Sequence, residues 1–226
     1  GVQTCALPIC WDGMTLGLNY TFSSMPGTED DHQGALNISI PLSKWLPKAY
    51  AGYSLNTNRH GDTTQQVSLY GTALKDSNLS YSVMEGYSNH ENSGNNGTLS
   101  VDYTGRAGEA NMGYNYDPDS RQVNYGVQGG VVVHPYGVTF SQSLSEDIQS
   151  LALVRSPGVS DVTVENGTGV STDWRGYAIV PYLTPYRRTT VRLDTSTLAD
   201  NAEVDSSTAQ VVPTEGAIVL AGFKTH

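Results

Sequence analysis

The chain has 226 residues, of which 15% are charged, against roughly 25% in an average soluble domain. It carries 12 Lys and Arg against 22 Asp and Glu, a formal net charge of −10, and no cluster of cations that could neutralise phosphates, which argues against nucleic-acid binding. With 24 Gly and 14 Tyr but only 3 Phe, the composition favours a β-rich protein over a helical bundle, because the surface of a bundle needs many charged side chains.

Residues 1–10 do not share the pattern of the rest of the chain. They contain both cysteines, Cys5 and Cys10, and the stretch from Gly1 to Ile9 resembles a translated sequencing adapter. We therefore interpret 1–10 as a non-native segment. A signal-peptide core is the alternative, although neither a basic region nor an initiator Met precedes it. We draw no conclusion about redox state from these two cysteines.

From Trp11 onward, apolar and small polar residues alternate with a period of two, which places successive side chains on opposite faces of a strand. The pattern predicts about eight strands of roughly ten residues each. Short turns rich in Gly, Asn and Asp separate them, so we expect neighbouring strands to form antiparallel hairpins. Their apolar segments are Leu16–Phe22, Leu36–Leu42, Ala51–Leu55, Val67–Leu69, Leu79–Val83, Leu99–Tyr103, Ala110–Tyr116 and Val123–Val127.

The two faces of these strands differ in a way that leaves two interpretations open. One face is apolar and the other carries Ser, Thr, Asn, Gln and Gly, with few charges on either. In a transmembrane barrel the apolar face contacts lipid and the small polar face meets water, and strands of about 9 to 11 residues suffice to cross. A soluble β-sheet is the alternative. In the barrel interpretation, possible members of an interfacial aromatic belt are Tyr20, Tyr53, Tyr81, Tyr103 and Tyr116.

After about Ser145 the sequence changes to short, β-branched runs separated by Gly and Pro. Strands at such close spacing predict a small β-sandwich. The expected fold class is therefore all-β, with barrel strands followed by an Ig-like sandwich. The runs are Leu151–Val154, Val162–Val164, Tyr177–Val180, Val191–Leu193, Val211–Val212 and Ile218–Ala221.

The sequence contains no nucleophile elbow, no phosphate-binding glycine loop and no paired zinc-binding motif. Glu29, Asp30, Asp31 and His32 form a local cluster, but consecutive strand residues diverge, so a solvated loop explains it better than a metal site. The same interpretation applies to two further pairs: His60 with Asp62, and His90 with Glu91. We expect no enzyme activity, no metal and no cofactor.

Several motifs, in one order, resemble the outer-membrane ushers of the chaperone-usher fimbrial pathway. The resemblance covers nearly all of the chain after residue 10 and is closest from Ser120 to Phe223. The motifs are SIPLSKWL, TTQQVSLYGTAL, NLSYSVMEGY, RQVNYGVQGGVVVHPYGVTFSQ, LALVRSPGV, VTVENGTGVSTDWRGYAIVPYLTPYR, LDTSTLADNAEVD and VVPTEGAIVLAGF.

The resemblance implies a multi-pass β-barrel in the outer membrane, with periplasmic domains that bind complexes of a periplasmic chaperone and a pilus subunit. It implies that residues 11–143 form the C-terminal part of the barrel, about its last eight or nine strands, and that 144–226 form the first periplasmic C-terminal domain. The expected function is secretion and polymerisation of pilus subunits, driven by strand exchange and needing no cofactor. A soluble β-rich adhesin or binding module is the alternative.

The stretch GVSTDWRGYAIVPYLTPY, residues 169–186, holds the candidate site residues. The candidates for partner binding are Asp173, Arg175, Tyr182 and Arg187. The residues assigned to the structural motif are Trp174, Gly176, Tyr177 and Pro181, and we expect Trp174 to lie in the core of the sandwich. For Arg175 the alternative is a surface ion pair with Asp173 or Glu165.

Strand orientation stays open at this point. If the strand that ends near Val133 is the last to span the membrane, the turns near residues 27, 59, 90 and 118 are extracellular. If Val138 to Gln142 also spans, those turns are periplasmic.

Overall fold

The computed structural model describes every residue except 1, 12, 25, 28, 91–92 and 145–149. The described residues form β-strands and two short 3-10 helices, η1 (Lys75–Ser77) and η2 (Thr195–Thr197). The strands are β1 (Val2–Trp11), β2 (Met14–Ser23), β3 (Asp31–Pro41), β4 (Ala49–Asn58), β5 (Thr63–Ala73), β6 (Leu79–Ser88), β7 (Asn95–Gly105), β8 (Gly108–Tyr116), β9 (Arg121–Gln128), β10 (Gly130–His134), β11 (Gly137–Ser141), β12 (Ser150–Arg155), β13 (Tyr177–Leu183), β14 (Thr189–Arg192), β15 (Thr208–Val211) and β16 (Ile218–Gly222).

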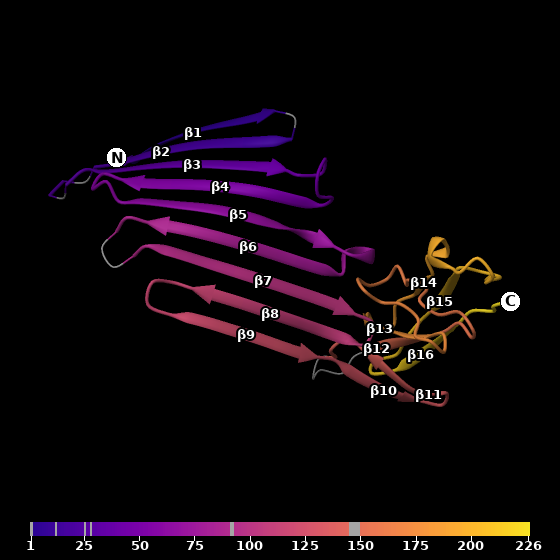
Figure 1. The fold of residues 1–226 in the computed structure, drawn as a ribbon. Helices are drawn as coiled ribbons and strands as arrows, with labels where there is room; N and C mark the ends of the chain where they lie inside the picture. The colour runs from indigo at the N-terminus through magenta and orange to yellow at the C-terminus, as the bar shows by residue number, and fades with distance from the viewer. Residues whose placement is uncertain (1, 12, 25, 28, 91–92, 145–149) are drawn as a thin grey trace. The chain divides into compact units, whose positions relative to one another are not determined.

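Strands β1 to β9 form one sheet in chain order, and Figure 1 shows them side by side with alternating directions. The eight strands predicted from the alternation correspond to β2–β9, so that prediction is confirmed. The structure also places Val2–Trp11 in a strand that pairs with β2, which the sequence pattern did not predict. The non-native origin of residues 1–10 stays a prediction.

The register puts the apolar residues of neighbouring strands on one face of the sheet. Leu36 pairs with Leu18 on one side and with Leu55 on the other. Asn37 pairs with Ser54, which belongs to the opposite face. Because side chains alternate along each strand, this pairing separates an apolar face from a small-polar face across the sheet.

The apolar face of the sheet is exposed. Val67 is 55% exposed at the middle of β5, and Val123 and Tyr125 of β9 are 62% and 84% exposed. A contiguous exposed apolar face of this kind is rare on soluble monomers and is typical of a surface that contacts lipid.

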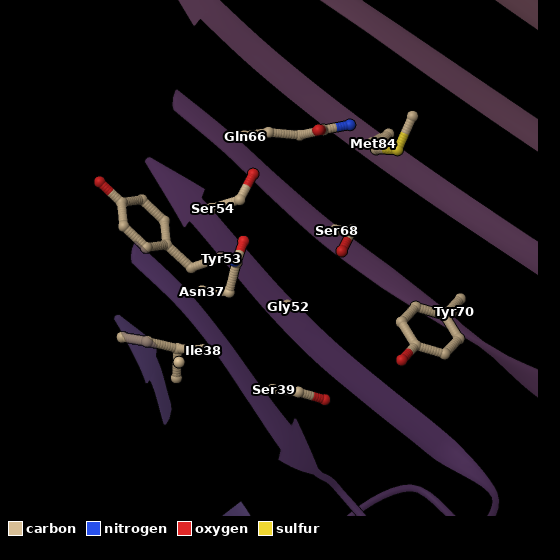
Figure 2. A pocket seen from close by; sticks show the side chains of 11 residues that line it. Asn37, Ile38, Ser39, Gly52, Tyr53, Ser54, Gln66, Ser68, Tyr70 and Met84 are labelled. Atoms are coloured by element: carbon tan, nitrogen blue, oxygen red, sulfur yellow. The ribbon is translucent and has the colours of Figure 1, made fainter. Parts of the chain in front are cut away.

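The small-polar face carries a shallow hollow of about 320 Å³ over strands β2 to β6. Figure 2 shows Asn37, Ser54, Gln66 and Ser68 on neighbouring strands around it. Tyr50 and Tyr70 stack at one side of this face, with their ring centroids 5.6 Å apart. Hydroxyl and amide groups at this density favour contact with water over a dry core.

The chain divides into two compact units. The first comprises Gly1–Ala73, Ser80–Val101 and Met112–Tyr125. The second comprises Leu74–Leu79, Asp102–Asn111 and Gly126–His226, so it contains the sandwich together with short ends of the sheet strands. The domain division at residue 143 stays a prediction.

The sandwich is built around strand β12, which pairs with β13 on one side and β16 on the other. On one face of this sheet lies the main core, which includes Val154, Val180 and Val191, all buried. On the other face, Leu151, Leu153 and Ile179 pack against Val132 of β10. Strand β12 is therefore buried on both faces, between the layer formed by β14 and β15 and the hairpin of β10 and β11.

Two details of the second unit differ from the sequence expectations. The strand expected at Val162–Val164 is absent: these residues are buried, and they form only isolated bridges, from Thr163 to Ser171 and from Val164 to Leu193. The turn through Gly167 and Gly169 begins directly after Val164, which leaves no room for a longer β-ladder. Of residues 138–142, which the sequence left as a possible spanning strand, 138–141 belong to the five-residue strand β11 (Gly137–Ser141).

Candidate partner-binding surface

The Asp173–Tyr177 turn is organised by the carboxylate of Asp173. Its Oδ1 accepts hydrogen bonds from the backbone N–H groups of Arg175 (2.8 Å) and Tyr177 (3.0 Å), and its Oδ2 accepts one from Arg175 Nη2 (3.0 Å). Burial raises the pKa of Asp173. These hydrogen bonds, with that from the N–H of Tyr177 foremost, lower the pKa by more than burial raises it, so the pKa lies below its ordinary value. The turn therefore contains a charged carboxylate at neutral pH.

Gly176 completes this turn in a conformation that needs glycine. Its φ is +87°, and a Cβ at this position would lie 1.9 Å from the carbonyl oxygen of Ser156. The backbones are joined there, because the N–H of Ser156 donates to the carbonyl of Gly176 at 2.8 Å. This close approach supports a structural role for Gly176.

Arg175 connects the turn to the β10–β11 hairpin. Its Nη2 donates to the carbonyl of Val138 and, at 3.1 Å, to the hydroxyl of Thr139, besides its ion pair with Asp173. Its guanidinium also lies 5.2 Å from the ring centre of Tyr177. These contacts agree with the alternative of an ion pair with Asp173 and give both residues a positioning role.

Trp174 projects from the turn into solvent. Its side chain is 79% exposed, so the expectation that it lies in the sandwich core is wrong. The reason is local. Asp173 and Gly176 reverse the direction of the chain before β13, and Trp174, between the hydrogen-bonded residues Asp173 and Arg175, points outward. The guanidinium of Arg175 lies 5.7 Å from the indole ring and supports it from one side.

The other candidates lie near the end of β13 and in the turn that follows it. Tyr182 is 60% exposed, has a φ of +61°, and donates its hydroxyl to the carbonyl of Ser143 at 2.8 Å. It follows Pro181 at the point where the register between β12 and β13 shifts, as expected for a proline at a bulge. Arg187 is exposed in the turn before β14. The structure does not bring Arg187 into the Asp173–Tyr177 turn.

The comparison with protein families matches residues 8–223 to the family described as outer membrane usher protein. The chain belongs to this family. Similar curated proteins are the usher FimD of Escherichia coli strain K12, 48% identical over 206 residues, and the usher LpfC of Salmonella typhimurium strain LT2, 45% identical over 208 residues. The matches with FimD and LpfC cover 87% and 92% of this chain, and 23% and 24% of the lengths of FimD and LpfC, respectively. The chain thus spans about a quarter of the length of the ushers it matches.

A solved structure agrees on the fold. It is the cryo-EM structure of an E. coli P pilus tip assembly intermediate, PapC-PapD-PapK-PapG, in its second conformation. The match covers 97% of this usher chain and 27% of that chain, with a TM-score of 0.64. At 23% identity the likeness shows the fold alone: an open antiparallel sheet of barrel type followed by a small sandwich.

Residues 134–137 of this usher join β10 to β11 and contribute to an aromatic cluster that the sequence does not reveal. The ring of His134 lies 5.5 Å from that of Tyr177, Tyr136 stacks on Tyr177 at 6.0 Å, and the guanidinium of Arg155 lies 4.6 Å from the ring centre of Tyr136. The motif HPYG carries no spacing that reveals these contacts, because they join strands that are far apart in the sequence.

His134 gives the usher a pH-sensitive contact at this cluster. Burial foremost, and the nearby charge of Arg175, lower the pKa of His134 below its ordinary value, while Asp173 partly offsets them. His134 Nδ1 accepts a hydrogen bond from the backbone N–H of Tyr136 at 3.2 Å, Nε2 lies 2.8 Å from Thr139 Oγ1, and the rings of Tyr136 and Tyr177 lie beside the imidazole.

We expect acidification to destabilise the second unit through His134. The folded state favours the neutral imidazole, so this stability is fully present above about pH 6.5, the unfolded pKa, and is lost as the pH falls through the lower folded pKa. The measurement is the urea midpoint of proteolytic cleavage in the sandwich between pH 7.5 and 5.5. His134→Gln should flatten this dependence, and an unchanged slope in that variant would contradict the assignment.

The loop expected over residues 29–32 is only partly found, because Asp31 and His32 begin strand β3, where they pair with Ser23 and Phe22 of β2. Glu29 pairs with Arg59, which also donates to the carbonyl of Asp30. His90 lies 3.3 Å from Asp62, whereas its predicted neighbour Glu91 is outside the described residues. Within the described part of the usher, no group of three or more His, Cys, Asp or Glu side chains is placed to hold a metal. No described helix is long and apolar enough to cross a membrane.

Proposed function

We propose that this chain forms part of the outer-membrane wall of an usher and holds its sandwich on the periplasmic side, where chaperone–subunit complexes arrive. One observation carries the proposal: a nine-stranded sheet exposes an apolar face opposite a small-polar face and leads directly into a sandwich. Lipid on one side and water on the other match these faces. Membership of the usher family favours this function over a soluble adhesin.

The lengths of the strands support one orientation. Strands β2 to β9 have 8 to 11 residues, close to the roughly 9 to 11 that a crossing needs, whereas β10 and β11 have five each, about half of that length. Strand β9 is then the last to cross, and it ends on the side of the sandwich. The turns near residues 27, 59, 90 and 118 lie at the opposite ends of the strands and are extracellular in this proposal.

The exposed Trp174 is the centre of the proposed surface for chaperone–subunit complexes. Tryptophan is enriched among the residues that dominate interface energies, because it buries a large rigid area on binding. Asp173 and Arg175 hold the turn that presents it. In this proposal the surface also includes Tyr182, near the end of β13, and Arg187, in the turn after it. No bond chemistry is required, since strand addition between pilus subunits supplies the driving force.

Replacing Trp174 with alanine in the complete usher should weaken capture of purified chaperone–subunit complex by about thirtyfold, as expected for an interface hot spot of roughly 2 kcal/mol. The measurement is an equilibrium binding titration on usher in detergent. Trp45→Ala is the matched control, because Trp45 is 77% exposed in the turn between β3 and β4. Equal affinities of the two variants, with heat-modifiable migration intact, would remove Trp174 from the binding surface.

A further inference from the structure

The hairpin of β10 and β11 has an outer face made of four large apolar side chains. Val131 pairs with Phe140 and Val133 with Val138, so the four share one face. Val131 is 57% exposed and Phe140 62%, while Val133 is 73% exposed and Val138 44%. A hairpin that met only periplasmic water would carry polar residues at such positions.

The opposite face of the hairpin is firmly packed, so the exposed face cannot turn inward. Val132 is 4% exposed and belongs to a buried cluster with Leu151, Leu153 and Ile179. Thr139 and His134 are also buried and lie 2.8 Å apart through Oγ1 and Nε2. Together with the hydrogen bonds from Arg175 to this hairpin, these contacts fix which four side chains point away from the sandwich.

Along the chain, the apolar positions of β9 and of the outer face of the hairpin fall in one alternation. Val127 is 85% exposed, and the same parity runs from it through Gly129 to Val131 and Val133. Glycine allows a close junction, because a Cβ at Gly129 would lie 3.0 Å from the carbonyl oxygen of Ala107 and 3.3 Å from that of Ser141. The hairpin is therefore held directly against the β7–β8 turn, without a flexible linker.

We propose that the outer face of the β10–β11 hairpin inserts into the periplasmic leaflet of the outer membrane and anchors the sandwich to phospholipid. The inference rests on the proposed function, since it needs β9 to face lipid. The alternation shared with β9 favours lipid over a protein partner, and the four side chains carry no charge and no hydrogen-bonding group. Tyr136, at the tip of the hairpin, is 45% exposed and is an aromatic residue of the kind that suits the headgroup region.

The test uses an environment-sensitive fluorophore on single cysteines of the complete usher, with Cys5 and Cys10 replaced, in bilayers of phosphatidylethanolamine and phosphatidylglycerol. The hairpin sites are Val133 and Phe140. Val67, on the exposed apolar face of the sheet, is the positive reference, and Glu203, exposed in the sandwich, is the negative one. Nitroxide-labelled phospholipid is the quencher, and heat-modifiable migration confirms folding of each labelled protein.

We expect the lipid quencher to act on both hairpin sites as strongly as on Val67 and several-fold more than on Glu203. Quenching at Val67 with hairpin sites no different from Glu203 would overturn the anchor and leave the proposed wall intact. If lipid does not quench the hairpin sites, and bound chaperone–subunit complex protects them from iodide, a water-soluble quencher, then the outer face of the hairpin binds a protein partner instead. Absence of lipid quenching at Val67 itself would overturn the proposed function as well.

Discussion

Replacing Gly176 with alanine should destabilise the sandwich by about 3 kcal/mol or more, because two penalties add at this position. A φ of +87° is unfavourable for any residue with a Cβ. The new Cβ would also lie 1.9 Å from the carbonyl oxygen of Ser156 and 3.2 Å from that of Val159, and both are backbone atoms that cannot rotate away. Relief requires the Asp173–Tyr177 turn to separate from the end of β12.

The effect is measured as the urea midpoint of proteolytic cleavage in the sandwich, in the complete usher. Gly158→Ala is the matched control, since Gly158 has a φ of +79° but nothing within 4 Å of its would-be Cβ. We expect the control to lose only about 1 kcal/mol from backbone strain. Equal losses in the two variants would mean that the approach of Gly176 to Ser156 does not stabilise the native sandwich.

Arginine at Val67 should prevent a large fraction of the usher from folding into the membrane. Val67 is on the apolar face at the middle of β5, where a charge facing lipid costs about 2 to 4 kcal/mol. Its neighbour Gln66 pairs with Ser54 on the small-polar face, so arginine there meets water and should cost little. The comparison keeps the strand, the depth and the new side chain the same and changes only the face.

The readout is the fraction of protein in the outer membrane that migrates in a heat-modifiable form. Val67→Arg should lower this fraction strongly, while Gln66→Arg should stay near the unsubstituted level. If both variants fold equally well, or if Gln66→Arg is the worse of the two, then the face of Val67 does not contact lipid.

The sheet was the part of the fold most accessible from sequence. Period-two alternation is a local property, and runs such as Leu36–Leu42 carry it without reference to any partner strand. The register agrees because slipping by one residue would move Leu36 from the face of Leu18 and Leu55 to the face of Asn37. The identity of the strands and their faces therefore follow from the same pattern.

The candidate site was less accessible, because its geometry depends on contacts between distant segments. The exposure of Trp174 follows from the left-handed backbone of Gly176 and from hydrogen bonds to Asp173, and neither can be read from residue type alone. The partnership of Arg175 with Val138 and Thr139 joins residues almost 40 positions apart. The composition, rich in Gly and Tyr, correctly indicated a β-rich protein, but it could not show which aromatic residues are exposed.

The orientation of the strands needed the structure for a different reason. The sequence left open whether the strand that ends near Val133 is the last to span the membrane or whether Val138 to Gln142 also spans. A tight turn after His134 separates β10 from β11, and each has about half the length that a crossing needs. Val132 packs against Leu151, Leu153 and Ile179 of the sandwich, and this contact supports the orientation proposed above.

Solvent accessibility along β5 tests the central claim most directly. Single cysteines at Gln66, Val67, Ser68 and Leu69, in a complete usher without Cys5 and Cys10, would be reacted with a water-soluble maleimide in native outer membranes. The account predicts a period of two: labelling at positions 66 and 68, which share the small-polar face, and protection at 67 and 69, which share the lipid-facing side. Uniform labelling at all four positions, or the opposite alternation, would contradict a wall with lipid on its apolar face.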